Sequence, residues 1–280
     1  MTKHFFGHYI VISLLMSKNE IVMAIQRYST YPPSIFIALH AVNTSIIPLF
    51  VRSVPESEKY LLLTRPIYQA PFLEPLILAI PIVAHVASGI VLRSMRARRR
   101  ARLYGAETRK QRSLIQSWPN PSLQARLGYG LLPLLGIHVA VNRFVPLAVD
   151  GGSSSVGLGY AAHGFSRSPI VWNCFYALFV TVGVWHVVGG WASWMGHRVT
   201  TTRAKKGSGR EGILGSMENF DEARRQRKAR WVVYGVAALA TAVWLAGGLG
   251  IVGRGGSGVG WEAKSWDNLY RQVPVIGEWL

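Results

Sequence analysis

The apolar residues of this chain are gathered into long continuous blocks, and they do not recur at the spacing typical of a half-buried soluble helix. The clearest block covers residues 71–92 and is interrupted by three polar side chains, those of Glu74, His85 and Ser88. At a rise of about 1.5 Å per residue, a helix of this length crosses a hydrocarbon core about 30 Å thick. Five blocks of this kind predict transmembrane helices over residues 31–51, 71–92, 125–147, 169–195 and 231–252.

The order of these blocks predicts an all-α, polytopic membrane protein with five transmembrane helices, the first four of which form a core bundle. The predicted transmembrane domain covers residues 31–252. Residues 1–30 are predicted to be an N-terminal tail, because their apolar run at residues 5–16 is too short to cross a membrane. We expect this start to be uncleaved and poorly ordered. Residues 253–280 are predicted to be a C-terminal tail.

The chain carries 31 Lys and Arg against 13 Asp and Glu, a formal net charge of +18. The basic residues gather in loops beside the spans. Residues 93–112 contain nine Lys and Arg against one Glu, and residues 197–230 contain ten against four acidic residues. Because basic loops stay on the cytosolic side during insertion, we expect the N-terminus and both basic loops on that side. This distribution favours anionic membrane lipids as partners over nucleic acid, which requires a folded basic surface.

Histidine is unevenly distributed along the chain. Four of the eight histidines lie inside predicted spans, one in each of the first four, namely His40, His85, His138 and His186. For a single intramembrane histidine, a hydrogen bond between helices is the simplest interpretation. Four histidines on consecutive helices favour another interpretation, in which facing imidazoles are axial ligands of haem iron inside the bundle.

The depth of each histidine in its span favours two pairs, His40 with His138 and His85 with His186. The predicted cofactor is therefore haem b, with the first pair as ligands of one iron and the second pair as ligands of another. The two pairs differ in depth by about 6 Å, which is a small separation for two haems. The sequence leaves open whether the protein holds one haem, two haems or none.

Small residues follow two of the histidines along the same helix face. Gly89 stands four residues after His85, and Gly189 and Gly190 stand three and four residues after His186. Because they lack side chains, these glycines leave room for either a flat ring or the backbone of a neighbouring helix.

The sequence contains no nucleophile with an adjacent base, phosphate-binding loop, dinucleotide fingerprint or paired-carboxylate motif. Its single cysteine, Cys174, excludes an internal disulfide and a thiolate metal cluster. We therefore expect a protein that is not an enzyme. In pattern, however, five helices with these four histidines resemble the di-haem cytochrome b anchors of succinate:quinone and fumarate:quinone reductases. That resemblance implies an alternative function, a cytochrome b-type electron-transfer subunit of a quinone-linked oxidoreductase.

A second resemblance is closer at the level of sequence. It is carried by LHAVNTSIIPLFVRSVPESEKYLLLTRPIYQAPFLEPLILAIPIVAHVASG (residues 39–89), by GIHVAVNRFVPL and by WHVVGGWASW. These runs resemble the fungal mitochondrial adaptor family first known for compensating loss of the tether between the endoplasmic reticulum and mitochondria. The resemblance covers about residues 28–252. It implies a mitochondrial outer-membrane protein of lipid homeostasis, which recruits a bridge-like lipid-transfer protein and, as a further implied activity, scrambles the phospholipids delivered to it.

Overall fold

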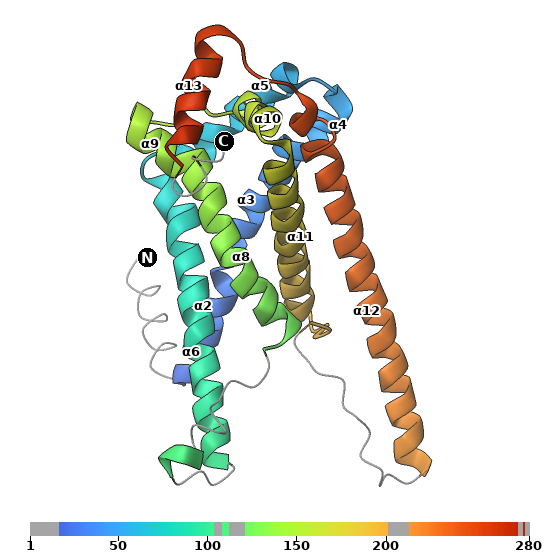
Figure 1. The fold of residues 1–280 in the computed structure, drawn as a ribbon. Coiled ribbons are helices and arrows are strands. Elements are labelled where there is room, and N and C mark those ends of the chain that lie inside the picture. The colour runs from blue at the N-terminus through green and yellow to red at the C-terminus, as the bar shows by residue number, and fades with distance from the viewer. Residues whose placement is uncertain (1–16, 104–107, 112–120, 201–212, 274–276, 278–280) are drawn as a thin grey trace, which may run out of the picture. The chain divides into compact units, whose positions relative to one another are not determined.

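The computed structural model of the protein describes residues 17–103, 108–111, 121–200, 213–273 and 277 (Figure 1). The α-helices with described bounds are α2 (Lys18–Tyr28), α3 (Tyr31–Ala41), α4 (Ile47–Val51), α5 (Val54–Gln69), α6 (Ile80–Leu103), α8 (Leu123–Val139), α9 (Val145–Asp150), α10 (Leu158–Arg167), α11 (Pro169–Trp194), α12 (Ile213–Gly248) and α13 (Gly260–Arg271). Between some of them lie three π-helical segments, η1 (Val42–Ile46), η2 (Pro75–Ala79) and η3 (Ala140–Phe144), and one 3-10 segment, η4 (Val252–Arg254). No strand occurs among the described residues.

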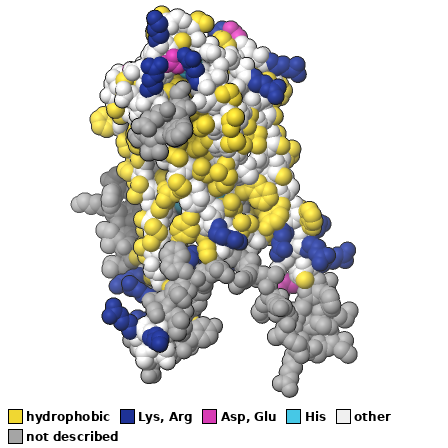
Figure 2. Space-filling view, in the orientation of Figure 1, with side chains coloured by type: hydrophobic (Ala, Val, Ile, Leu, Met, Phe, Trp, Pro, Cys, Tyr) yellow, Lys and Arg dark blue, Asp and Glu magenta, His cyan; other side chains and the backbone are white. Residues whose placement is uncertain are grey.

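Among the described residues, five helical stretches are long and apolar enough to cross a membrane, as the sequence predicts. They are Lys18–Val51, Pro75–Leu103, Leu123–Asp150, Pro169–Trp194 and Glu222–Arg254. Large apolar side chains along them are exposed, and in Figure 2 apolar side chains cover the surface along the helices while Lys and Arg gather where helices end. Lipid is as apolar as these side chains, so their exposure is the expected state of a membrane-spanning helix. The predicted fold class is confirmed.

Some segments that we predicted to be tails or loops are helical. Helix α2 occupies residues 18–28 of the predicted N-terminal tail and starts at a capping box, in which Ser17 and Glu20 bond to each other's backbone N–H. Helix α5 occupies the predicted loop between the first two spans, α10 occupies the loop between the third and fourth spans, and α13 occupies the predicted C-terminal tail. Residues 1–16 lie outside the described residues, as do residues 104–107, 112 and 201–212 of the two basic loops, whereas residues 93–103 and 213–230 of these loops are helical parts of α6 and α12.

The chain divides into two compact units, the first made of residues 1–38 and 65–120 and the second of residues 39–64 and 121–280. In the first unit, α2 packs along α6. In the second unit, α11 packs against both α8 and α12, and η1 packs against α12. Helices α10 and α13 of the second unit pack on each other outside the spans. Together with the start of α11 they contribute to a buried aromatic and aliphatic core that includes Tyr160, Trp172, Trp266, Leu269 and Tyr270.

Each π-helical segment is followed, after one residue, by a proline. The residue before the proline donates its N–H to the carbonyl five residues back, as Ile47 does to Val42 and Val145 does to Ala140. A proline has no N–H, and its ring collides with the carbonyl four residues back in a regular α-helix. The wider π turn relieves that collision, so the prolines at 48, 81 and 146 determine where η1, η2 and η3 form.

Candidate functional site

His40 and His138 lie close together in the second unit. His40 is in the last turn of α3, and His138 is in the last turn of α8. Their ring centroids are 6.0 Å apart, and the ring planes are inclined at 72°. A π-helical segment begins two residues after each of them. The structure therefore brings together the first of the two histidine pairs predicted from the sequence.

Aromatic side chains from α11 and α12 surround these two imidazoles. Phe179 stacks on His138 with 4.9 Å between ring centroids, and Tyr176 meets the same imidazole edge to face at 5.8 Å. On the other side of the pair, the indole of Trp244 lies 6.4 Å from His40. These rings restrict the rotation of the imidazoles and limit the access of water to them.

The separation of the two imidazoles fits a metal ion between them. A bond between a metal ion and an imidazole nitrogen is about 2 Å long, so two imidazoles on opposite sides of one ion have ring centroids about 6 Å apart. The observed separation of 6.0 Å agrees with this value.

The donor set also indicates which kind of metal centre fits. Among the described residues, no group of three or more His, Cys, Asp and Glu could hold a metal ion. A metal ion held by these two histidines would therefore have no third His, Cys, Asp or Glu ligand among the described residues. The porphyrin of haem supplies four nitrogen ligands and leaves the two axial positions to the protein. Haem at His40 and His138 stays a prediction.

Asn142 connects the His138 imidazole to its neighbours. The residue belongs to η3, one turn beyond His138, and its amide N–H groups donate to the His138 carbonyl oxygen at 2.8 Å and to Tyr176 Oη at 3.3 Å. The same amide nitrogen lies 3.4 Å from His138 Nδ1. The π turn created by Pro146 therefore places a polar group where it can orient the histidine and the tyrosine together.

His85 has a different environment, within the first unit. Its Nδ1 lies 3.2 Å from the backbone carbonyl oxygen of Gln26, and the Gln26 amide nitrogen lies 3.1 Å from Nδ1 and 3.2 Å from Nε2. The Ser88 hydroxyl donates to Gln26 Oε1 at 2.7 Å. A methyl group on Gly89 would lie 3.3 Å from Gln26 Oε1. The space that we predicted beside Gly89 is therefore filled by this glutamine.

His186 has a corresponding environment within the second unit. The Gln124 amide donates to the His186 carbonyl oxygen at 2.8 Å and lies 3.2 Å from His186 Nδ1, while Gln124 Oε1 accepts a hydrogen bond from Thr200 Oγ1 at 3.1 Å. Because the amide donates to Nδ1, the His186 ring carries its proton on Nε2 in this arrangement. A methyl group on Gly189 would lie 2.6 Å from Gln124 Oε1, so this glutamine also fills the predicted space.

The two glutamines occupy equivalent places in an internal repeat of the chain. Gln26 precedes His40 by the same number of residues as Gln124 precedes His138, and the runs HAVNTSIIPL and HVAVNRFVPL begin at these histidines. The second histidine of each half begins a similar run, HVASG in one case and HVVGG in the other. The predicted site residues did not include the glutamines, because nothing in the sequence around either glutamine indicates that it bonds to a histidine on another helix. The repeat is the sequence signal that could have found them.

The transmembrane-domain model of MDM10-complementing protein 1 matches residues 35–122 and 133–257 of the chain. The match covers more than half of the chain and contains all four intramembrane histidines. The chain belongs to this family. Membership confirms the resemblance found in the sequence and supports a mitochondrial membrane protein linked to MDM10 complementation. No curated protein and no solved structure matches the chain.

The family match contains the histidines but neither of the glutamines that bond to them. Gln26 lies before its first residue, and Gln124 lies in the gap between its two parts. His85 and His186 belong to different units, and each is bonded by a glutamine of its own unit. The pairing of His85 with His186 at a second haem stays a prediction.

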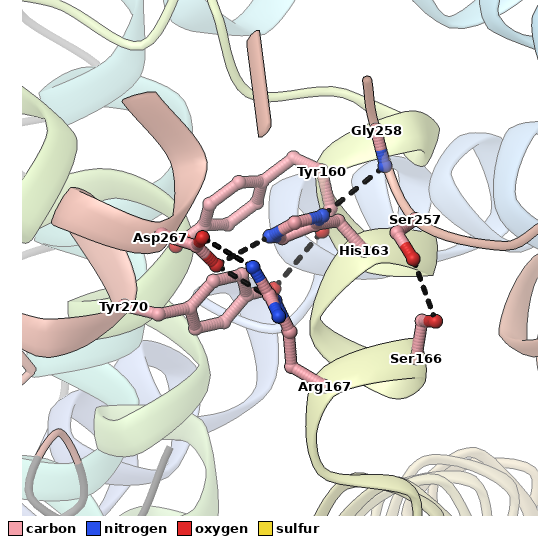
Figure 3. Close-up of polar contacts among 8 residues, drawn as sticks. All are labelled: Tyr160, His163, Ser166, Arg167, Ser257, Gly258, Asp267 and Tyr270. Carbon is pink, nitrogen blue, oxygen red and sulfur yellow. Dashed lines mark hydrogen bonds and ion pairs between the residues drawn. The ribbon is translucent and has the colours of Figure 1, made fainter. Parts of the chain in front are cut away.

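A second polar cluster joins α10 to α13, and α13 lies beyond the end of the family match (Figure 3). His163, whose side chain is fully buried, accepts a hydrogen bond at Nδ1 from the Gly258 N–H at 3.1 Å. Its Nε2 donates to Asp267 Oδ1 at 2.9 Å, and the Arg167 guanidinium pairs with the same carboxylate. Both ring nitrogens of His163 are engaged, so this histidine connects α10 to α13 and has no nitrogen available for a ligand.

Ionisation in this second cluster is consistent with a structural role. Burial raises the pKa of the Asp267 carboxyl, but hydrogen bonds from Arg167 and His163 lower it by more, so this pKa lies below its ordinary value. Burial raises the pKa of the Tyr160 and Tyr270 hydroxyls. The two tyrosine rings stack at 4.5 Å, and Tyr270 Oη donates to the Tyr160 carbonyl oxygen at 3.1 Å. At neutral pH the carboxylate is charged and the tyrosines are neutral, which is the state that these contacts require.

Proposed function

We propose that this protein is a non-enzymatic, multi-pass protein of the mitochondrial outer membrane. In this proposal it acts in lipid homeostasis as an adaptor for a bridge-like lipid-transfer protein, and it holds haem b between His40 and His138. Family membership supports the mitochondrial membrane. The separation of 6.0 Å between the two imidazole centroids is the observation that supports haem. The N-terminus and both basic loops are assigned to the cytosolic side because of their excess of Lys and Arg.

The residues around the pair have separate roles in this proposal. His40 and His138 would each hold the iron through one imidazole nitrogen, which would link α3 to α8. Phe179 and Tyr176 hold the His138 ring in position, and Asn142 connects that tyrosine to the histidine backbone. Bound haem supplies reversible one-electron chemistry at its iron. Linking two helices needs no substrate, so the same site suits a protein without enzymatic activity.

Haem titration of purified apo-protein tests this site. The proposal predicts that the absorbance change saturates at about one haem per chain through the His40–His138 pair, with the spectrum of a six-coordinate bis-histidine complex. His138→Ala removes this binding. His197→Ala is the matched control, because His197 is exposed and lies outside the pair. Equal haem binding by the His138→Ala variant and the wild type contradicts the proposal. If the wild type binds a second haem per chain and His85→Ala does not, the second predicted pair, His85 with His186, also binds haem.

The adaptor role is tested in cells that lack MDM10. Expression of the wild-type chain is expected to restore growth and mitochondrial shape, and a lipid-transfer protein is expected to co-purify with it. Removal of residues 1–16 is expected to abolish co-purification while the protein remains in the membrane, because the lipid-transfer protein is proposed to bind the cytosolic N-terminal side. Failure of the full chain to restore growth at wild-type membrane levels contradicts the adaptor proposal.

The same histidine pair also favours the alternative function, electron transfer to or from quinone. An electron carrier must exchange electrons with a quinone and with a dehydrogenase subunit, whereas an adaptor need not. The two functions are separated by adding a quinol analogue to the oxidised, haem-loaded protein and following the absorbance of the iron. Rapid reduction that requires the quinol, together with a co-purifying dehydrogenase, would replace the adaptor proposal by the electron-transfer function.

A further inference from the structure

A cavity of about 560 Å³ opens in the second unit, at the ends of two spans. One wall comes from the end of α10 and the start of α11, and the other comes from the residues that follow α12. Helix α11 begins at Pro169 and α12 ends at Gly248, so both walls lie where a span meets the water phase. Phospholipid headgroups occupy this depth of a bilayer. The location of the cavity therefore favours a lipid as its occupant.

The polar groups of this cavity favour an anion. Arg254 is exposed in the wall, and its guanidinium makes no hydrogen bond or ion pair with any residue that the structure describes. No Asp or Glu is among the described residues that line the cavity. Glycines 250, 253 and 256 line the wall beside Arg254, so no side chain from these positions covers the guanidinium. An uncompensated guanidinium at the membrane surface attracts phosphate oxygens, which it can bind through two N–H groups.

The opposite wall adds hydrogen-bond donors and apolar surface. The first turn of α11 faces the cavity at Pro169, and the Ser168 side chain does not cap that turn, so the positive end of the helix dipole contributes to the same region. Ser166 presents a hydroxyl in this wall and bonds to Ser257 at 3.0 Å, as Figure 3 shows. Leu249, which is half-buried, supplies apolar surface for the part of a lipid that lies next to its headgroup, and Phe165 is buried beneath the same wall.

We propose that this cavity binds an anionic phospholipid, with the lipid phosphate on Arg254 and the adjoining glycerol and acyl carbons against Leu249. The proposal rests on the membrane-lipid role proposed above and does not depend on haem. The cavity would be a specific lipid site, in contrast to the general attraction of basic loops for the membrane surface. A free phosphate ion shares the chemistry of the headgroup but not the apolar contacts, so the two sources can be separated by competition.

The test measures binding of fluorescent phosphatidylglycerol to the full chain in a neutral detergent. The proposal predicts that Arg254→Gln weakens binding about tenfold, because charge-assisted hydrogen bonds are lost. Arg271→Gln is the matched control, since it removes the same charge from an exposed position outside the cavity and is expected to leave binding unchanged. Unlabelled phosphatidylglycerol is expected to displace the probe, and phosphatidylcholine is expected to displace it poorly. Equal binding by Arg254→Gln and Arg271→Gln overturns the proposal.

Competition by phosphate and a second arginine variant complete the test. Displacement of the lipid by millimolar inorganic phosphate, as effectively as by the lipid itself, would show a simple anion site and overturn the assignment to a lipid. If Arg254→Gln elutes as aggregate, Arg254→Lys is measured in its place. Lysine keeps the positive charge but cannot form the bidentate hydrogen bonds of arginine with a phosphate, so weaker binding than in the wild type is expected. Haem absorbance is recorded on each sample, so a wild-type protein that holds haem but does not bind the lipid refutes this proposal alone. Arg254-dependent lipid binding without haem would refute the haem proposal alone.

Discussion

Gly247 allows α12 to lie directly against the π-helical segment η1 in the second unit. A methyl group at this position would overlap the Ser45 carbonyl oxygen and lie 2.5 Å from Ser45 Cα. Ordinary contacts of such a methyl group lie at 3.4–4 Å, so Gly247→Ala requires α12 and η1 to separate by about 1 Å. Small residues permit close helix contact in membranes, and here the close contact is with backbone, which cannot move aside as a flexible side chain does.

The expected loss of stability follows from the contacts that this separation breaks. The Ser45 hydroxyl donates to the Val243 carbonyl oxygen at 2.8 Å, and the Trp244 indole N–H donates to Thr44 Oγ1 at 3.2 Å. Each such bond between membrane helices contributes about 0.6 kcal/mol on average, and overpacking adds about 1–3 kcal/mol. Alanine regains up to about 1 kcal/mol over glycine in a helix interior. The net loss is about 2 kcal/mol in the free energy of unfolding, which lowers Tm by about 4–8 °C.

Heating of the detergent-purified variants, followed by size-exclusion chromatography of the material that remains soluble, measures this change. Gly235→Ala is the control, because nothing lies within 4 Å of a methyl group at that position of the same helix. That variant is expected to be as stable as the wild type or slightly more stable. If Gly247→Ala and Gly235→Ala unfold at the same temperature, the inference that α12 packs directly against the backbone of η1 at Gly247 is wrong.

Two further predictions concern the polar contacts. Gln124→Ala removes hydrogen bonds to His186 and Thr200 and is expected to lower the free energy of unfolding by about 1–2 kcal/mol, measured by the same heating assay, whereas an equal Tm would refute this role. Asp267→Asn weakens the contact with His163 and Arg167. In the wild type the pKa of Asp267 is lower in the folded state than in the unfolded state, so the stabilisation from its carboxylate is complete above about pH 4 and is lost as pH falls through the folded pKa. The Tm difference between wild type and Asp267→Asn should therefore be present at pH 7 and narrow in acid, and a difference that does not change with pH would contradict the assignment.

The parts of the fold that were predictable from sequence are those with a local signal. An apolar block of bilayer length predicts a transmembrane helix independently of the rest of the chain, because a single segment in lipid can form all of its backbone hydrogen bonds only as a helix. The histidines were equally visible, because ionisable side chains inside such blocks are rare. The capping box at Ser17 and Glu20 was also a local signal, and it would have placed the first helix start earlier than residue 31.

Other features depended on contacts between distant segments. His163 looks like a loop histidine, because its burial is completed by α13, about one hundred residues later in the chain. Helix α13 itself is short and polar. Its buried residues Trp266, Leu269 and Tyr270 lie at a helical spacing, but this spacing identifies a buried helix face only when the packing of α10 against it is known. Gln26 was inconspicuous for a similar reason, since its partner His85 lies on another helix.

The most direct test of the proposed core is the reduced-minus-oxidised absorbance spectrum of the protein purified from haem-sufficient cells. The imidazole rings of His40 and His138 are 6.0 Å apart, so we predict a b-type signal in the wild type and in the His197→Ala control, and its loss in His138→Ala. Absence of a Soret band from the wild type, or an unchanged signal in His138→Ala, would contradict haem binding at this pair and leave the two histidines as polar contacts between helices.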